Sequence, residues 1–127
     1  MRLALDTNRY VDFCRGDESI VNAVRAARDI ILPFVTLAEL RAGFACGMRS
    51  QANAAVLTRF INRPRVGVLF ADDGTTRQYA NLFRQLRQQG TPIPVNDLWI
   101  AALCVQHDLI LASRDCHFDL LPQIPRA

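Results

Sequence analysis

Four acidic residues occupy positions from which a folded chain could use them in chemistry: Asp6, Glu39, Asp97 and Asp115. Asp6 and Asp115 each follow a short apolar run, and Glu39 and Asp97 lie near the starts of apolar helical segments. If the fold brings them together, like charges must be protonated, paired with arginine or neutralised by a cation. Oxygen-only ligands suit Mg²⁺ or Mn²⁺. The pattern therefore points to a carboxylate-bound divalent ion.

Each of these acids also has a purely structural interpretation. Asp6 could begin a turn, and Asp97 could be an anion that a helix N-terminus favours. Glu39 lies three residues after Thr36, which is the spacing of a capping box. Asp115 could be a surface loop residue, so no single acid decides the matter. The remaining acids are interpreted as solvated groups in turns or at helix starts, namely Asp12, Asp17, Glu18, Asp29, Asp72, Asp73, Asp108 and Asp119.

The basic residues exclude several classes of chemistry. All 15 are arginines, and the formal net charge is +3. Without lysine the chain cannot carry out P-loop phosphate transfer or Schiff-base catalysis. The mild positive charge is compatible with nucleic acid. Three arginines near the acids (Arg9, Arg41 and Arg114) are candidates for phosphate contacts, although ordinary surface positions explain them better.

The hydrophobic pattern predicts short apolar strands that alternate with helices. Such alternation indicates an α/β fold with a mainly parallel central sheet flanked by helices. Ligands of such sheets bind beyond the carboxyl ends of the strands, where Asp6 and Asp115 fall. Strands are expected at 3–5, 30–32, 66–70 and 109–112, and helices at 7–14, 18–28, 36–46, 52–61, 73–89 and 97–105.

The length of 127 residues fits one domain, 1–127, without a second core. No apolar run reaches the roughly 20 residues of a membrane span, and the first residues do not form a signal peptide, so we expect a cytoplasmic protein. The four cysteines show no metal-binding spacing, and Cys46 and Cys104 are expected in the core. Trp99 and Phe118 are also expected as core aromatics.

Taken together, the motifs resemble those of the PIN-domain family. They are Asp6-Thr7-Asn8 after the first strand, Glu39 in T-L-A-E-L-R-A-G, Asp97 in P-I-P-V-N-D-L-W-I-A-A and Asp115 in S-R-D-C-H-F. The match extends over the whole chain, in order. Within that family the chain resembles VapC-type toxins. This resemblance implies that the chain is a Mg²⁺- or Mn²⁺-dependent endoribonuclease that is inhibited by a cognate antitoxin.

The resemblance also implies roles for the four acids. Asp6 and Asp97 would be the main metal ligands, and Asp115 would complete the ligand set or hold a second ion. Glu39 would orient the attacking water or be a ligand of that second ion. Asp119 is the alternative to Asp115. Both histidines lie outside the motifs, so a histidine general base is disfavoured.

Three other functions remain open from the sequence. The chain could be a catalytically silent module that binds RNA or protein, although all four acids are present. It could be an aspartate-nucleophile phosphatase, against which the missing lysine and D-x-D motif argue. It could also be a PIN nuclease of RNA maturation. For a toxin we expect an antitoxin partner and a homodimer, with spare apolar faces on the helices at 18–28 and 52–61.

Overall fold

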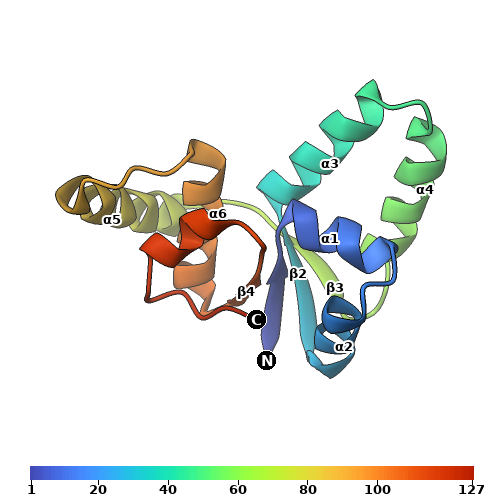
Figure 1. The fold of residues 1–127 in the computed structure, drawn as a ribbon, viewed down its shortest axis with the longest axis horizontal. Helices are drawn as coiled ribbons and strands as arrows, with labels where there is room; N and C mark the ends of the chain where they lie inside the picture. Colours follow the sequence, from blue (N-terminus) through green and yellow to red (C-terminus); the bar gives the residue numbers. More distant parts are fainter.

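A computed structural model describes all residues from 1 to 127 as one parallel sheet with helices on both faces (Figure 1). The strand order is β3-β2-β1-β4, and every pairing is parallel. The predicted α/β class is confirmed. The strands are β1 (Arg2–Leu5), β2 (Asp29–Pro33), β3 (Val66–Leu69) and β4 (Ile110–Ala112).

The helices fall close to their predicted places, with their ends moved by a few residues. They are α1 (Thr7–Cys14), α2 (Glu18–Ala26), α3 (Phe34–Cys46), α4 (Ser50–Ile61), α5 (Asp73–Gln89), α6 (Val95–His107) and the 3₁₀ helix η1 (Cys116–Leu120). Helices α3 and α6 both begin directly after a proline that ends the preceding extended segment. Proline fits there because the first backbone N–H groups of a helix have no partner within it.

The capping-box interpretation of Thr36 and Glu39 is wrong. Helix α3 begins at Phe34, so Thr36 lies inside the helix and not at its N-cap. Its fully buried hydroxyl donates instead to the backbone carbonyl of Leu5 at 2.9 Å. Thr36 therefore ties α3 to the end of β1, and Glu39 is free for another role.

Alternate strand residues face two separate cores. Leu3 and Leu5 pack under α1, α2, α3 and α4, while Ala4 packs under α5 and α6. Ile30 and Ile31 divide between the same two cores. Successive side chains of a strand point to opposite faces, so β1 and β2 must be apolar throughout. The sequence shows these unbroken apolar runs.

Two expectations about apolar residues need correction. Cys46 is exposed at the end of α3, while Cys104 is buried in α6 as expected. The apolar faces of α2 and α4 are not spare, because their large side chains are buried in the chain's own core (Ile20, Val24, Leu57 and Phe60). A small sheet needs these helices to cover one of its faces.

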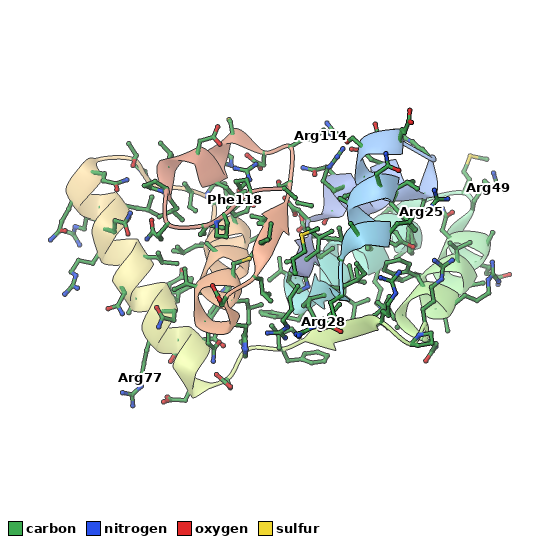
Figure 2. The ribbon with its side chains drawn as sticks, turned by 90° about the horizontal axis from the view of Figure 1, so that it is seen from below. Arg25, Arg28, Arg49, Arg77, Arg114 and Phe118 are labelled. Atoms are coloured by element: carbon green, nitrogen blue, oxygen red, sulfur yellow. The ribbon has the colours of Figure 1, made fainter.

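The aromatic expectations are partly confirmed. Phe118 is 1% exposed, and it lies within the part of the molecule formed by α6 and η1 (Figure 2). Trp99 is half-buried and packs on Tyr79 with ring centroids 4.4 Å apart. No helix is both long enough and apolar enough to span a membrane.

The candidate metal centre

Asp6 is buried where β1 meets α1. Its Oδ1 accepts the backbone N–H of Thr7 at 2.8 Å, so it is the N-cap of α1. Its Oδ2 accepts the hydroxyl of Ser113 at 2.7 Å. Leu5 pairs with Ala112, the last residue of β4, which places Ser113 at the same sheet edge as Asp6. Asp6 therefore caps α1 and does not merely begin a turn as considered from the sequence, and it also faces the loop that follows β4.

Asp97 and Asp115 meet at the imidazole of His117. Nδ1 of His117 is 2.8 Å from Oδ2 of Asp97 and 2.9 Å from Oδ1 of Asp115. One ligand atom from each residue lies within 4.8 Å of the other two. Asp97 is in the first turn of α6, and Asp115 precedes η1, where it accepts the backbone N–H of His117. Two of the predicted acids therefore lie next to each other, bridged by a histidine.

Glu39 reaches the same region from α3. Its carboxylate accepts the hydroxyl of Thr7 at 3.2 Å. Although Glu39 reaches solvent, partial desolvation and then the negative charges of Asp6 and Asp97 raise its pKa. Burial also raises the pKa of Asp97, as do the charges of Asp115 and Asp6. Asp97 and Asp115 thus share one tight group with His117, and the charges of Asp6 and Asp97 act on Glu39 from nearby.

The loop that carries Asp115 is held by its own hydrogen bonds. The hydroxyl of Ser113, which donates to Asp6, also accepts the backbone N–H of Asp115 at 3.0 Å. The backbone N–H of Arg114 donates to Oδ1 of Asn8 at 3.1 Å. These bonds link the loop after β4 to Asp6 and to α1, so they position Asp115 relative to Asp6.

Asp12 was expected in solvent, but it forms an ion-pair network. Arg9 and Arg114 contact its carboxylate at 2.8 and 2.7 Å. The two guanidinium groups, Arg114 first, lower the pKa of Asp12. Two of the three arginines considered for phosphate contacts, Arg9 and Arg114, therefore already pair with a carboxylate. The third, Arg41, is exposed and forms no ion pair within 4.0 Å. The arginines labelled in Figure 2 lie on different elements, Arg25 on α2 and Arg77 on α5 among them.

Asp119 is separate from the cluster. Its side chain is 72% exposed and pairs with Arg126 at 3.0 Å. Of the two acids considered for the fourth position, only Asp115 lies beside Asp97.

His117 is the residue that the sequence analysis missed. It was set aside because it lies outside the acidic motifs, yet it touches two of the four acids. Its hydrogen bond to Asp97 and the charge of Asp115 raise its pKa. The available signal was its position two residues after Asp115, where a tight turn can return the side chain to the carboxylate.

The donor set fits a divalent cation. Asp97, Asp115 and His117 offer two carboxylate oxygens and a ring nitrogen within reach of one ion, and the pKa of Asp97 and of Glu39 is raised. Clustered carboxylates that repel one another are stabilised by a cation. Carboxylate and imidazole groups are common ligands of divalent first-row metals.

A parallel sheet with acids at its carboxyl edge is the architecture of a known nuclease fold. The PIN domain model matches residues 3–123, so the chain belongs to the PIN-domain family. Among curated proteins it is similar to Ribonuclease VapC4 of Mycobacterium tuberculosis, with 31% identity over 90 residues, covering 71% of this chain and 69% of that protein.

Solved structures share the fold over nearly the whole chain. VapBC2 of Rickettsia felis, bound to a DNA fragment from its promoter, matches with a TM-score of 0.88 and 24% identity, covering 100% of this chain and 98% of that one. VapBC-5 of M. tuberculosis, a member of the VapBC family of toxin–antitoxin systems, matches with a TM-score of 0.70 and 25% identity, covering 99% and 98%.

Proposed function

We propose that this chain is a divalent-metal-dependent endoribonuclease and the toxic component of a type II toxin–antitoxin system. The observation that carries the proposal is the close group of Asp97, Asp115 and His117, with Asp6 and Glu39 near enough that the charge of Asp6 acts on Asp97 and on Glu39. The similarity to proteins named ribonuclease VapC supports RNA as the substrate. We further infer that residues 1–127 act as one PIN domain.

In this proposal three of the acids bind the ion and the fourth positions the attacking water. Asp6, Asp97 and Asp115 would hold the ion, Mg²⁺ or Mn²⁺. A bound divalent ion supplies Lewis-acid polarisation of the phosphodiester and lowers the pKa of water. Glu39, whose raised pKa favours proton uptake, would orient the attacking water and accept its proton. Ser113 and Thr7 would keep the carboxylates of Asp6 and Glu39 in place.

A groove among the helices on one face of the sheet has the properties needed to bind an antitoxin segment. It lies between α1, α3 and α4, with a volume of about 570 Å³. Its apolar lining includes Tyr10, Phe44 and Val56, and Arg15 and Arg49 supply positive charge. An amphipathic helix with acidic residues beside its apolar face would complement both properties.

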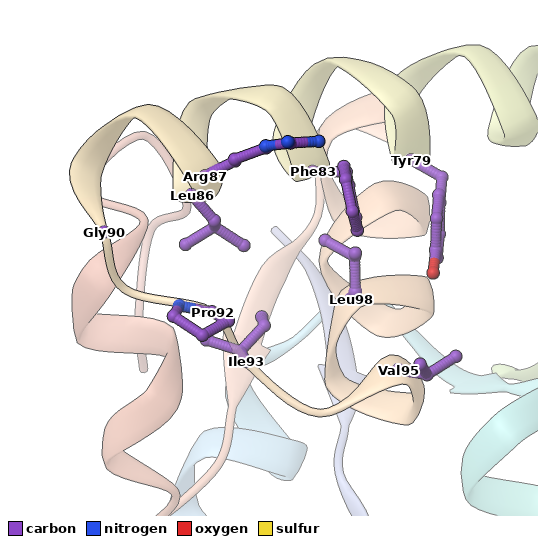
Figure 3. A pocket seen from close by; sticks show the side chains of 9 residues that line it. All are labelled: Tyr79, Phe83, Leu86, Arg87, Gly90, Pro92, Ile93, Val95 and Leu98. Carbon is purple, nitrogen blue, oxygen red and sulfur yellow. The ribbon is translucent and has the colours of Figure 1, made fainter.

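A second copy of the chain would cover a different surface. The apolar faces of α2 and α4, which were first expected to form the homodimer, pack into the chain's own core. Exposed apolar residues instead occur on α5 and at the start of α6, where Phe83 is 50% and Val95 is 58% exposed. They flank an apolar cavity of about 250 Å³, lined also by Leu86, Ile93 and Leu98 (Figure 3). We infer that this face forms the homodimer, and Phe83→Ser should then yield a monomer in light scattering.

The central experiment is cleavage of a mixed RNA pool by the purified chain with Mg²⁺, Mn²⁺ or a chelator. We expect cleavage only with metal, and its loss in Asp6→Asn. Asp119→Asn is the matched control, because Asp119 is an exposed acid outside the cluster. Metal-independent cleavage, or equal loss in the control, would refute the proposal. For the toxin role, growth arrest on induction should be relieved by a small protein encoded beside this gene.

A further inference from the structure

A ring nitrogen lies inside the carboxylate cluster. Nδ1 of His117 is within 3 Å of one oxygen of Asp97 and one of Asp115, and these two acids come from different elements. The site is therefore not an all-oxygen one, which is what the four acidic motifs by themselves describe. A nitrogen donor changes which ions a site prefers.

The position of His117 is set by the backbone around it. Its N–H donates to Oδ1 of Asp115 at 2.9 Å, and Asp115 is held in turn by the hydroxyl of Ser113. The next residue, Phe118, is 1% exposed and anchors η1 in the core. The backbone of His117 is thus held between the hydrogen bond to Asp115 and the buried Phe118, with its imidazole beside the two carboxylates.

We propose that His117 is a ligand of the same ion as Asp97 and Asp115, and that this mixed nitrogen and oxygen site prefers Mn²⁺ to Mg²⁺. The inference rests on the proposed metal-dependent function. Imidazole suits first-row transition ions, whereas Mg²⁺ favours carboxylate, carbonyl and water oxygens. Ligation uses the neutral ring with its proton on Nε2, which leaves the lone pair of Nδ1 free.

A counter-ion role for His117 predicts the opposite change in metal affinity when the side chain is removed. If His117 were only a counter-ion, its ring would balance the two carboxylates and would compete with any entering cation. Removing it would then strengthen the binding of both ions. If it is a ligand, removing it weakens Mn²⁺ binding and affects Mg²⁺ much less. The sign of the change in Mn²⁺ affinity separates the two roles.

Calorimetric titration of the full chain with Mn²⁺ and with Mg²⁺ measures this sign. We expect His117→Ala to weaken Mn²⁺ binding about tenfold or more, the scale of losses at metal-site positions. Mg²⁺ affinity should change by less than about threefold, so that the preference for Mn²⁺ collapses. The side chain of His117 is 40% exposed, so its removal leaves no large cavity. Tighter binding of both ions, or equal weakening of both, would overturn the proposal.

A spectroscopic measurement tests for the bond between Mn²⁺ and the ring nitrogen of His117. Electron spin-echo envelope modulation of the Mn²⁺-loaded chain should show coupling to a directly bound nitrogen. The coupling should be absent in His117→Gln, which keeps a polar side chain, and retained in His107→Gln. His107 is the other histidine and ends α6, whereas Asp97 is near its start. Coupling that persists in His117→Gln would contradict the ligand role.

These measurements also separate the two levels of inference. If the wild-type chain binds neither Mn²⁺ nor Mg²⁺, the proposed metal-dependent function fails and the role of His117 fails with it. If the wild-type chain binds both ions and His117→Ala binds them as tightly, only the ligand role of His117 is wrong.

Discussion

Replacing Asp97 with Asn removes one metal-binding charge and should reduce the stabilisation that the ion provides. Asn keeps the shape of the side chain, and its amide oxygen can still accept a hydrogen bond from His117. The fold should therefore survive while the affinity for the cation falls. This prediction separates a metal ligand from a helix-terminal anion, because Asn serves at helix starts about as well as Asp.

The size of the effect follows from linkage. An ion at about 100 times its Kd stabilises the protein by about 2.7 kcal/mol. At about 2.1 cal/mol/K per residue, a chain of 127 residues has an unfolding entropy of about 0.27 kcal/mol/K. The wild-type Tm should therefore rise by about 10 °C when Mn²⁺ is added. Asp97→Asn should show a shift of only about 1.5–5 °C at the same ion concentration, since a hundredfold to tenfold loss of affinity leaves about 0.4–1.4 kcal/mol of the linkage term.

Without metal, the variant should be about as stable as the wild type at neutral pH. The pKa of Asp97 is raised by burial and by the neighbouring carboxylates. Its ionised form therefore destabilises the protein above that pKa, and this destabilisation decreases as the pH falls. Asn removes this cost, and it also weakens the bond to His117. The two effects oppose each other, so the metal-free Tm should change by less than about 4 °C, or about 1 kcal/mol.

Differential scanning fluorimetry with and without Mn²⁺, paired with an RNA cleavage assay, checks both parts. Asp119→Asn is the control, and its metal-induced shift in Tm should equal that of the wild type. An undiminished metal-induced shift in Asp97→Asn would refute the assignment of this carboxylate as a ligand. Retained metal-dependent cleavage in both Asp6→Asn and Asp97→Asn would refute the shared site.

Three further predictions concern the groups that hold the site. Ser113→Ala removes the hydrogen bond to Asp6, and calorimetry should show Mn²⁺ affinity about 10- to 100-fold lower. Thr36→Val removes a buried donor to a β1 carbonyl, and urea unfolding should show a loss of about 1–3 kcal/mol. Asp12 has a lowered pKa because of Arg114 and a second arginine, so its stabilisation is present above the ordinary Asp pKa of about 4 and is lost on acidification. Asp12→Asn should accordingly flatten the fall of Tm at acid pH, and an unchanged acid profile would contradict this pairing.

The sequence by itself determined the architecture and the four acids. Unbroken apolar strands alternating with helices require a parallel sheet covered on both faces, because such strands cannot tolerate water on either side. The carboxyl ends of these strands share one edge of the sheet. The sequence therefore predicts that acids placed after β1 and β4, such as Asp6 and Asp115, lie at the same edge. The local sequence pattern was sufficient to predict the structure wherever packing of the core required the same pattern of residues.

Only the tertiary structure decided how side chains distant in sequence pair with one another. Thr36 resembles a capping residue by its spacing from Glu39, but its hydroxyl bonds to β1, which lies beside it only after folding. Asp12 reads as a solvated acid until the loop after β4 brings Arg114 against it. His117 reads as an isolated histidine, because the turn at Asp115 and the start of α6 join it to Asp97 only in three dimensions. Spacing along a chain records local geometry, and contacts between the ends of different elements are fixed by packing of the whole core.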